Sequence, residues 1–288
     1  MKLAVVTATV DSLRAAPCLE SWGDVPLVIV EQGRGPSWKG REGIYRLVST
    51  EILGVVPAFA RGVQVALRGG ADIVACLHDD LEIHDPGWAH VVQAMFQLNS
   101  TIGLVGFGGA TGLADHDIYR KPYDPMQLAR KNFMSNMRDA EAHGVRVTEA
   151  RQVACLDGFS QIGRRGYWEG CTPPDAKGFE ESEYPDGTNL FQVMQDWGIV
   201  HHAYDAALGC FANRLRWQTW MLPIPCHHHG GLTAVADPRY HEWAAHYSYE
   251  DLERPEKGVA EGDAGFWEKS HRVVYETFRD VLPIRVVI

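Results

Sequence analysis

Two adjacent carboxylates, Asp79 and Asp80, follow an apolar run at residues 73–77. Two like charges side by side raise each other's pKa unless an opposite charge neutralises them. A divalent cation provides that charge, because hard cations bind carboxylate oxygens. The pair therefore predicts a metal site at the end of a strand. A solvated turn, or a cap for the helix that follows, is the alternative.

A run of three histidines, His227-His228-His229, precedes two glycines. Histidine is a common metal ligand, and alternate residues of an extended segment point to the same side. His227 and His229 are therefore expected to share one face, and we predict that they bind the metal together with Asp80. Histidines that hydrogen-bond to the backbone of a polar loop are the alternative. The run alone is not expected to form a zinc site, because adjacent residues rarely close a tetrahedral shell.

An acidic stretch at residues 179–186 contains four carboxylates. Such stretches usually form solvated loops. A carboxylate held near the ligand-binding edge of a sheet can instead act as a general base that takes a proton from a hydroxyl group. Glu181 and Asp186 are the predicted candidates, and the residue types alone do not separate them.

The spacing of apolar residues predicts the elements that position these groups. Near-continuous apolar runs indicate strands at residues 3–9, 25–30, 73–77 and 102–107, with helices at 56–68 and from 86 onward. Alternation of such strands with helices predicts an α/β fold with a mostly parallel sheet covered on both faces. Ligands of these sheets bind beyond the carboxyl ends of the strands. Asp79, Asp80 and Glu31 all fall at such ends.

The second half of the chain is less regular. The polar residues 113–149 are expected to form an inserted lid or loop region, and residues 152–159 a strand that ends near Asp157 and Gly158. We predict a helix at residues 190–197 with Gly198 as its cap. A short strand is expected at residues 199–203 and a helix at 266–282.

Composition limits the functional classes. No segment approaches the ~20 consecutive apolar residues of a membrane span, and the first residues are too quickly polar for a signal peptide, so we expect a cytoplasmic protein. The six cysteines are scattered, which favours reduced thiols. The formal charge of −10 argues against a broad nucleic-acid interface and leaves room only for a local basic groove.

The order of these motifs resembles the GT-A glycosyltransferases, and especially their inverting, family 2-like members. The resemblance covers roughly residues 1–232 and rests on three segments: residues 54–62 with the glycines at 69–70, residues 71–88, and residues 156–198. Asp80 matches the last acid of the DxD-type metal motif, whereas His78 replaces the first acid. The histidine run matches the late histidine of this fold. Arg61 stands where many members have Asn, and Asn189 where many have Asp, which favours Asp186 as the base.

The resemblance implies a metal-dependent hexosyl- or pentosyltransferase that uses Mn2+ or Mg2+ and a nucleotide-sugar donor, with a UDP-sugar favoured. It implies inversion by a single displacement, with Asp186 or Glu181 as the general base. It also implies a GT-A domain at 1–232, with a donor half at 1–110 and an acceptor half at 150–232, and a packed C-terminal extension at 233–288. The implied donor-binding residues are Thr7, Ala8, Thr9, Glu31, Arg61, His78, Asp79, Asp80, Asp157 and Gly158.

Two other classes fit parts of the sequence. A metal-dependent hydrolase could use the Asp and His residues around a water nucleophile, and a non-catalytic sugar- or nucleotide-binding module could keep the fold without turnover. The acceptor is left open among a small molecule, a glycan and a modified nucleic-acid base. The oligomeric state is open as well.

Overall fold

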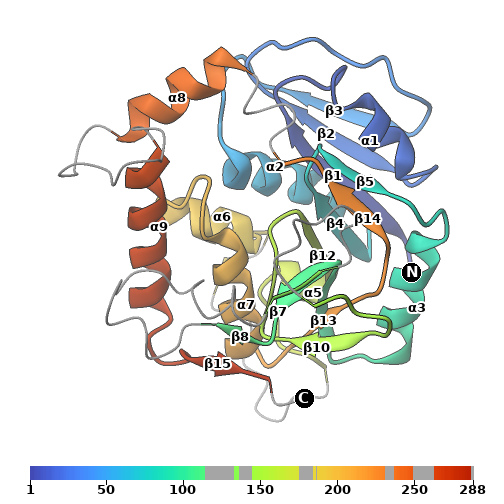
Figure 1. The fold of residues 1–288 in the computed structure, drawn as a ribbon, viewed down its shortest axis with the longest axis vertical. Coiled ribbons are helices and arrows are strands. Elements are labelled where there is room, and N and C mark those ends of the chain that lie inside the picture. The colour runs from blue at the N-terminus through green and yellow to red at the C-terminus, as the bar shows by residue number, and fades with distance from the viewer. Residues whose placement is uncertain are drawn as a thin grey trace.

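The apolar runs of the sequence form the centre of one large sheet, because their side chains are buried on both of its faces. The computed structural model describes residues 1–113, 133–135, 145–174, 184–185, 187–230, 237–248 and 263–286. Figure 1 shows the sheet with helices on either side of it. The α/β class with a large, mainly parallel central sheet is confirmed.

Eight strands form this central sheet in the order β10-β13-β6-β12-β4-β1-β2-β3. β4, β1, β2 and β3 are parallel neighbours, as are β6 and β13, whereas β12 and β10 run antiparallel to the strands beside them. The strand bounds are β1 Leu3–Thr9, β2 Leu27–Glu31, β3 Ile44–Val48, β4 Ile73–Leu77, β6 Ile102–Gly106, β10 Arg151–Val153, β12 Ser160–Arg164 and β13 Gln218–Met221.

Three smaller sheets extend the central one. Their strands are β7 Gly108–Ala110 between β11 Cys155–Leu156 and β9 Phe133–Ser135, β5 Leu81–Ile83 with β14 Cys226–His228, and β8 Gly112–Leu113 with β15 Ile284–Arg285. The helices are α1 Ala16–Ser21, α2 Val55–Arg68, α3 Trp88–Leu98, α5 Arg165–Trp168, α6 Leu190–Asp196, α7 Tyr204–Arg214, α8 Pro238–Ser248 and α9 Asp263–Thr277. Among the described helices, none is both long and apolar enough to cross a membrane.

Successive side chains of a strand point to opposite faces of the sheet, so the buried side chains form two cores, one on each face. Val5, Ala75 and Val105 face a core that α1 and α3 complete. Val6, Val74 and Leu104 face the other core, which includes residues of α2, α6 and α7. The C-terminal Phe278 also belongs to this second core, and its ring lies 4.9 Å from that of Phe211. The division of the chain into a domain at 1–232 and an extension stays a prediction.

Two expected strands differ in the structure. The predicted strand at 152–159 is two short strands, β10 and β11, which pair in different sheets, and the next segment forms β12. Residues 199–203 are no strand. Gly198 has φ +79° and Ala203 φ +64°, so left-handed residues bracket this segment, which joins α6 to the unpredicted helix α7. Gly198 does end α6, because Ile199 N–H donates to Met194 O and Gly198 N–H to Gln195 O, as in a Schellman motif.

Helix α2 approaches the sheet closely at Gly62. A Cβ atom there would lie 2.2 Å from Cγ1 of Val6, a fully buried side chain of β1. The neighbouring Arg61 is exposed on the other side of the helix. The lack of a side chain at residue 62 therefore sets the distance between α2 and β1.

We expect Gly62→Ala to lower the free energy of unfolding by about 1–2 kcal/mol, because overpacking of ~1–3 kcal/mol outweighs a helix-propensity gain of up to ~1 kcal/mol. Urea denaturation measures the change. Arg61→Ala is the control in the same helix and is expected to stay within about 0.5 kcal/mol. A Gly62→Ala variant more stable than the wild type would contradict the close approach.

Candidate functional site

The candidate site lies at the carboxyl end of β4. The chain adds β2 and β3 on one side of β1 and then crosses to place β4 on the other side, so the strand order reverses between β1 and β4. In open α/β sheets, ligands bind at such a switch point. His78 is the first residue beyond β4, and Asp79 and Asp80, both buried, form the turn that follows.

Antiparallel pairing brings a second segment to this edge. Ser160, the first residue of β12, pairs with Leu77, the last residue of β4. Asp157 and Gly158 directly precede β12 and therefore lie at the same edge of the sheet. The backbone N–H of His78 donates to Phe159 O at 3.1 Å, which joins the two segments.

A third segment, the histidine run, reaches the site through the two-stranded ribbon of β5 and β14. His228 pairs with Leu81, and His229 N–H donates to Asp80 O at 3.0 Å. A buried indole fixes β5 in turn: Trp22 Nε1 donates to Leu81 O at 2.8 Å. The ribbon thereby places Asp80 of the turn beside His228 of the histidine run.

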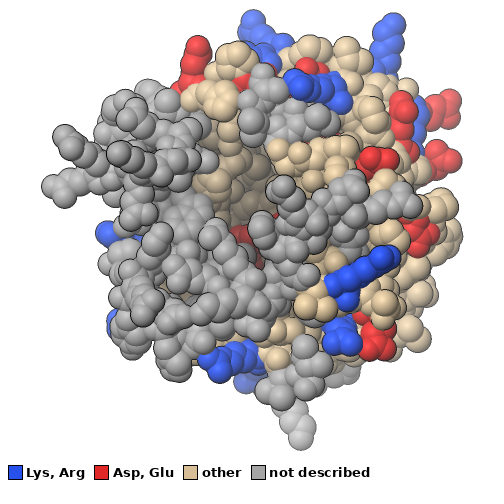
Figure 2. Space-filling model, in the orientation of Figure 1, with Lys and Arg blue, Asp and Glu red and all other residues tan. Residues whose placement is uncertain are grey.

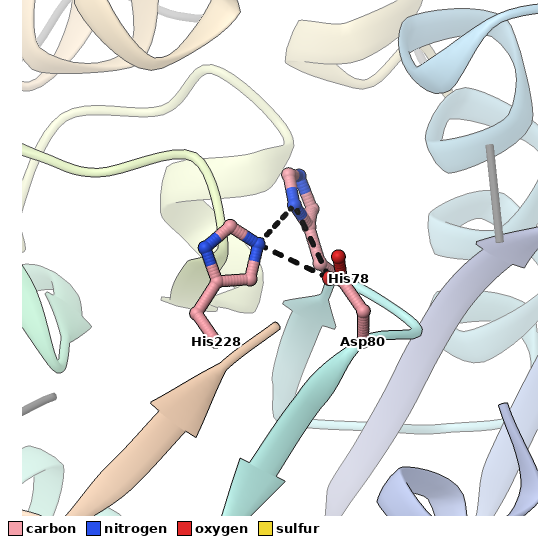
Figure 3. A group of neighbouring side chains, drawn as sticks. All are labelled: His78, Asp80 and His228. Carbon is pink, nitrogen blue, oxygen red and sulfur yellow. Dashed lines mark hydrogen bonds and ion pairs between the residues drawn. The ribbon is translucent and has the colours of Figure 1, made fainter. Parts of the chain in front are cut away.

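Three side chains converge in this place, as Figure 3 shows. His228 Nε2 lies 3.1 Å from Asp80 Oδ1 and 3.3 Å from His78 Nδ1, and His78 Nδ1 lies 4.0 Å from Asp80 Oδ1. One ligand atom from each residue thus lies within 4.8 Å of the other two. The ring of Phe159 stacks on His228 with centroids 5.1 Å apart. Two imidazoles and a carboxylate in this arrangement can hold a divalent metal ion.

The histidine beside Asp80 is not one of the two predicted. His227 and His229 do share a face, with ring centroids 4.2 Å apart, but this face points away from the site, and His229 Nε2 lies 3.4 Å from Glu82 Oε2. The reason is the register of the ribbon, which pairs His227 with Glu82 and so puts His228 on the face of the site. His78 was expected only as a donor-binding residue.

Tyr204 fixes the tautomer of His78. Its hydroxyl donates to Gly158 O at 2.9 Å and lies 2.6 Å from His78 Nε2. A hydroxyl has one proton, so His78 Nε2 donates to Tyr204, and in the neutral imidazole Nδ1 carries the lone pair. That lone pair faces His228 and Asp80. Gly158 is required here, because a Cβ atom at residue 158 would lie 2.5 Å from the Tyr204 hydroxyl.

Burial sets the charges of the site. Burial lowers the pKa of His78 to about 4, helped by His228 and opposed by Asp80, so the ring is neutral at neutral pH. Burial also lowers the pKa of His228, but its hydrogen bond to Asp80 and the nearby acids outweigh this effect and raise the pKa overall. The pKa of Asp157 is raised by burial, against His228 and backbone N–H groups.

The other predicted donor residues differ in what they contact. Thr7 is fully buried, and its hydroxyl donates to Leu77 O at 2.8 Å, so it ties β1 to β4. Ala8 is half-buried near the end of β1, and Thr9 Oγ1 accepts from Asp11 N–H at 3.1 Å. Glu31, at the end of β2, lies 2.6 Å from the guanidinium of Arg46.

Three predicted residues lie away from this cluster or outside the described part. Arg61 is exposed in the middle of α2, apart from the cluster of His78, Asp80 and His228. Both candidate bases, Glu181 and Asp186, lie outside the described residues, as does most of the predicted lid at 113–149. Their roles stay predictions.

The sequence reasoning missed Tyr204 and Asp205, which begin α7. The signal was available: an acid followed by the small and apolar residues 206–212 is typical of a helix N-terminus. Burial raises the pKa of Asp205 to about 6, Asp157 adds to the rise, and Ala206 N–H and His202 oppose it. Figure 2, drawn in the orientation of Figure 1, shows a hollow near the centre of the molecule, with acidic atoms on its floor.

Comparisons with known proteins find only distant structural similarity. The chain matches no family model, and it matches no curated protein. A197 from STIV is 11% identical over 81% of this chain and 87% of its own, with a TM-score of 0.41. The mannosyltransferase PcManGT from Pyrobaculum calidifontis, solved with GDP-Man and Mn2+, is 14% identical over 86% of this chain and 61% of its own, with a TM-score of 0.39. The galactosyltransferase LgtC is 13% identical over 56% of this chain and 57% of its own, with a TM-score of 0.27.

These structural neighbours include glycosyltransferases, but their identities and TM-scores are too low to transfer a function. The function has to be judged from the side chains at the carboxyl end of β4.

The pKa of Asp205 predicts a pH dependence of stability. Its folded-state pKa of about 6 exceeds the unfolded value of about 3.9. At pH values between these two, the folded chain therefore binds more protons than the unfolded chain. The free energy of unfolding therefore falls as pH rises through this window. Asp205→Asn removes this loss of stability at higher pH and keeps an acceptor for Ala206 N–H. We expect this variant to gain about 1–3 kcal/mol relative to the wild type between pH 4 and pH 7, measured by thermal denaturation. A stability difference that does not change with pH would contradict the assignment.

Proposed function

We propose that this chain is a metal-dependent glycosyltransferase that takes its sugar from a nucleotide diphosphate. The observation that carries the proposal is the cluster of His78, Asp80 and His228 at the switch point of the sheet. A nucleotide diphosphate is an anion at the edge where such sheets bind ligands, and a divalent cation is the natural link between that anion and a carboxylate.

The donor set fits a transition-metal ion better than Mg2+. Mg2+ prefers oxygen ligands in octahedral geometry, whereas two imidazoles and one carboxylate suit metals such as Mn2+ or Fe2+. His78 offers Nδ1, His228 offers Nε2 and Asp80 offers a carboxylate oxygen. We therefore propose Mn2+ as the cofactor, and when bound it would neutralise charge on the leaving diphosphate. Three protein ligands leave positions for phosphate oxygens.

The chain's own residues have separate roles in this proposal. Asp79, buried next to the ligand Asp80, faces the ribose or the sugar of the donor. The ends of β1 and β2, with residues 7–9 and Glu31, border the nucleoside, and a UDP-sugar is the favoured donor. Asp157 and Gly158 border the transferred sugar.

A carboxylate is proposed to deprotonate the acceptor hydroxyl. The acceptor oxygen would then bond to the anomeric carbon as the bond from that carbon to the nucleotide diphosphate breaks, and this single displacement inverts the centre. Asp186 and Glu181 are the candidates by motif. Asp205 is a further candidate, because its pKa of about 6 suits a base near neutral pH. The acceptor itself stays open among a small molecule, a glycan and a modified base.

The main test is a binding panel on the full chain. We expect Mn2+ together with a UDP-sugar or another nucleotide sugar to raise the melting temperature more than either alone. Asp80→Asn and His228→Ala should abolish the joint effect, because each removes a ligand. His90→Ala, an exposed histidine of α3, is the control and should behave as the wild type.

The panel also separates the rival functions. Stabilisation by metal alone, with no response to any nucleotide sugar, would contradict the transferase and favour a metal-dependent hydrolase. Joint binding without transfer or hydrolysis of the sugar under any acceptor would favour a binding module. Fe2+ under anaerobic conditions belongs in the panel, because the same donor set suits it.

Tyr204→Phe tests the orientation of His78. The variant keeps the ring but removes the hydroxyl that accepts from His78 Nε2, so we expect the Mn2+ affinity to fall by roughly 10–100-fold. Isothermal titration calorimetry measures it. The matched control is Tyr167→Phe, which removes another buried hydroxyl, bonded to Leu208 O at 2.7 Å, away from the histidines. If both variants lose the same affinity, Tyr204 acts only through general stability.

A further inference from the structure

The turn that follows β2 is strained and lies directly against the turn that follows β1. Gly33 has φ +70° and Arg34 has φ +57°, a left-handed conformation that is unfavourable for a residue with a side chain. A Cβ atom at Gly35 would lie 1.7 Å from Val10 O. Backbone strain of this kind persists only where surrounding contacts outweigh it, and it is common at functional sites.

Glu31 joins these two turns on one side. Its Oε1 accepts from the hydroxyl of Ser12 at 2.6 Å and from Arg46 Nη1 at 2.6 Å, and its Oε2 accepts from the hydroxyl of Ser37 at 2.9 Å. Ser12 belongs to the turn after β1, and Ser37 to the loop after β2. A carboxylate has about four acceptor positions, so most of the capacity of Glu31 is used to hold these segments together.

Helix α8 brings Arg239 to the same two turns from a distant part of the chain. Arg239 Nη1 donates to Gly33 O, and Nη2 lies 3.5 Å from Val10 O. Asp237, which is buried, holds the guanidinium in place by accepting from Nε at 2.9 Å and from Nη2. A single planar group therefore joins both turns, and a carboxylate fixes its orientation.

The described part of α8 continues along the same edge of the sheet. The hydroxyl of Tyr240 lies 2.6 Å from His201 Nε2. A Cβ atom at Gly54, the N-cap of α2, would lie 3.0 Å from the ring of Trp243. The N–H of Gly54 donates to Gln32 Oε1 at 3.1 Å, so this point is next to the end of β2. Helix α8 is therefore fixed at the carboxyl ends of β1 and β2.

We propose that Arg239 is a positioning residue for the nucleoside of the donor, an inference that rests on the proposed transferase function. In that function the ends of β1 and β2 border the nucleoside, and Arg239 fixes the backbone of the two turns at these ends. A binding site distinguishes one base from another by hydrogen-bonding groups that are held in place. The role of Arg239 is to maintain both the affinity for the nucleotide and the preference for its base.

Attachment of α8 to the sheet is the simpler role, and the chain offers a control for it. The side chain of Arg239 is 40% exposed, and exposed ion pairs contribute little to stability. Arg41 has the same chemistry at the amino end of β2, because it lies 3.4 Å from Asp24 and donates to Val25 O at 2.8 Å. Arg41→Ala therefore removes an arginine that joins a carboxylate to a backbone carbonyl away from the ligand-binding edge.

The test is titration calorimetry of the full chain with UDP, GDP, CDP and ADP in the presence of Mn2+. We expect Arg239→Ala to lower the affinity for the preferred nucleotide by roughly 10–100-fold, because displaced groups lose their alignment. Its preference among the bases should shrink, whereas its affinity for Mn2+ without nucleotide should equal that of the wild type. Arg239→Lys should not restore the preference, because an ammonium group cannot replace the planar fork. Arg41→Ala should match the wild type.

Amide hydrogen exchange without nucleotide adds a structural reading, because loss of Arg239 should increase exchange at residues 10–12 and 33–35. Circular dichroism establishes that each variant is folded, and Arg239→Lys, which keeps the charge, carries the test if the alanine variant does not fold. The proposal is overturned if Arg239→Ala keeps the wild-type affinities and preference, if Arg41→Ala loses as much, or if the Mn2+ affinity falls in parallel. A wild type that binds no nucleotide overturns the transferase function and this role together. A wild type that binds one, with no effect of Arg239→Ala, overturns only this role.

Discussion

The antiparallel pairing of β5 with β14 is the constraint on which the site depends. It joins a turn near residue 80 to a segment some 150 residues later, and no other element brings a histidine of that segment to Asp80 among the described residues. Register in such a pair is fixed by which side chains are buried. Leu81, Ile83 and Cys226 are all buried in one core, so a shift by one residue would expose them and turn His228 away.

Charge is the second constraint. Asp79 and Asp80 are buried, burial raises the pKa of Asp157 and of Asp205, and Asp157 adds to the rise at Asp205. Such a group of acids costs stability unless cations or protons reduce its charge. His228 supplies part of the compensation, because the acids raise its pKa. A fold that keeps several partly compensated acids at the ligand-binding edge is typical of a site whose full charge balance includes a ligand.

The sequence predicts the parts of this structure that local patterns determine. Strands β1 and β4 have the expected bounds, because continuous apolar residues are buried on both faces of the sheet. It does not predict β12, whose residues Ser160–Arg164 include Gln and Gly. Gln161 is tolerated there because its amide donates to the carbonyls of Leu156 and Asp157.

The histidine run shows the same limit at the site. Alternation correctly groups His227 with His229, yet which face they occupy is decided by the partner strand. That information is not local, because the face that each histidine occupies depends on the pairing of His227 with Glu82 in the other strand. A sequence argument can therefore find the histidines that share a face but not the one that meets Asp80.

The start of α7 completes the physical account of the site. Ala203 is buried with φ +64°, a left-handed conformation that costs a non-glycine residue about 1–2 kcal/mol. This turn directs Tyr204 between Gly158 and His78, where its hydroxyl contacts both. Backbone strain persists only where the surrounding contacts outweigh it, and it is common at functional sites. Here these contacts are the two hydrogen bonds of the Tyr204 hydroxyl, which orient the His78 imidazole toward Asp80, and the packing of the Tyr204 ring against Phe59 and Phe191.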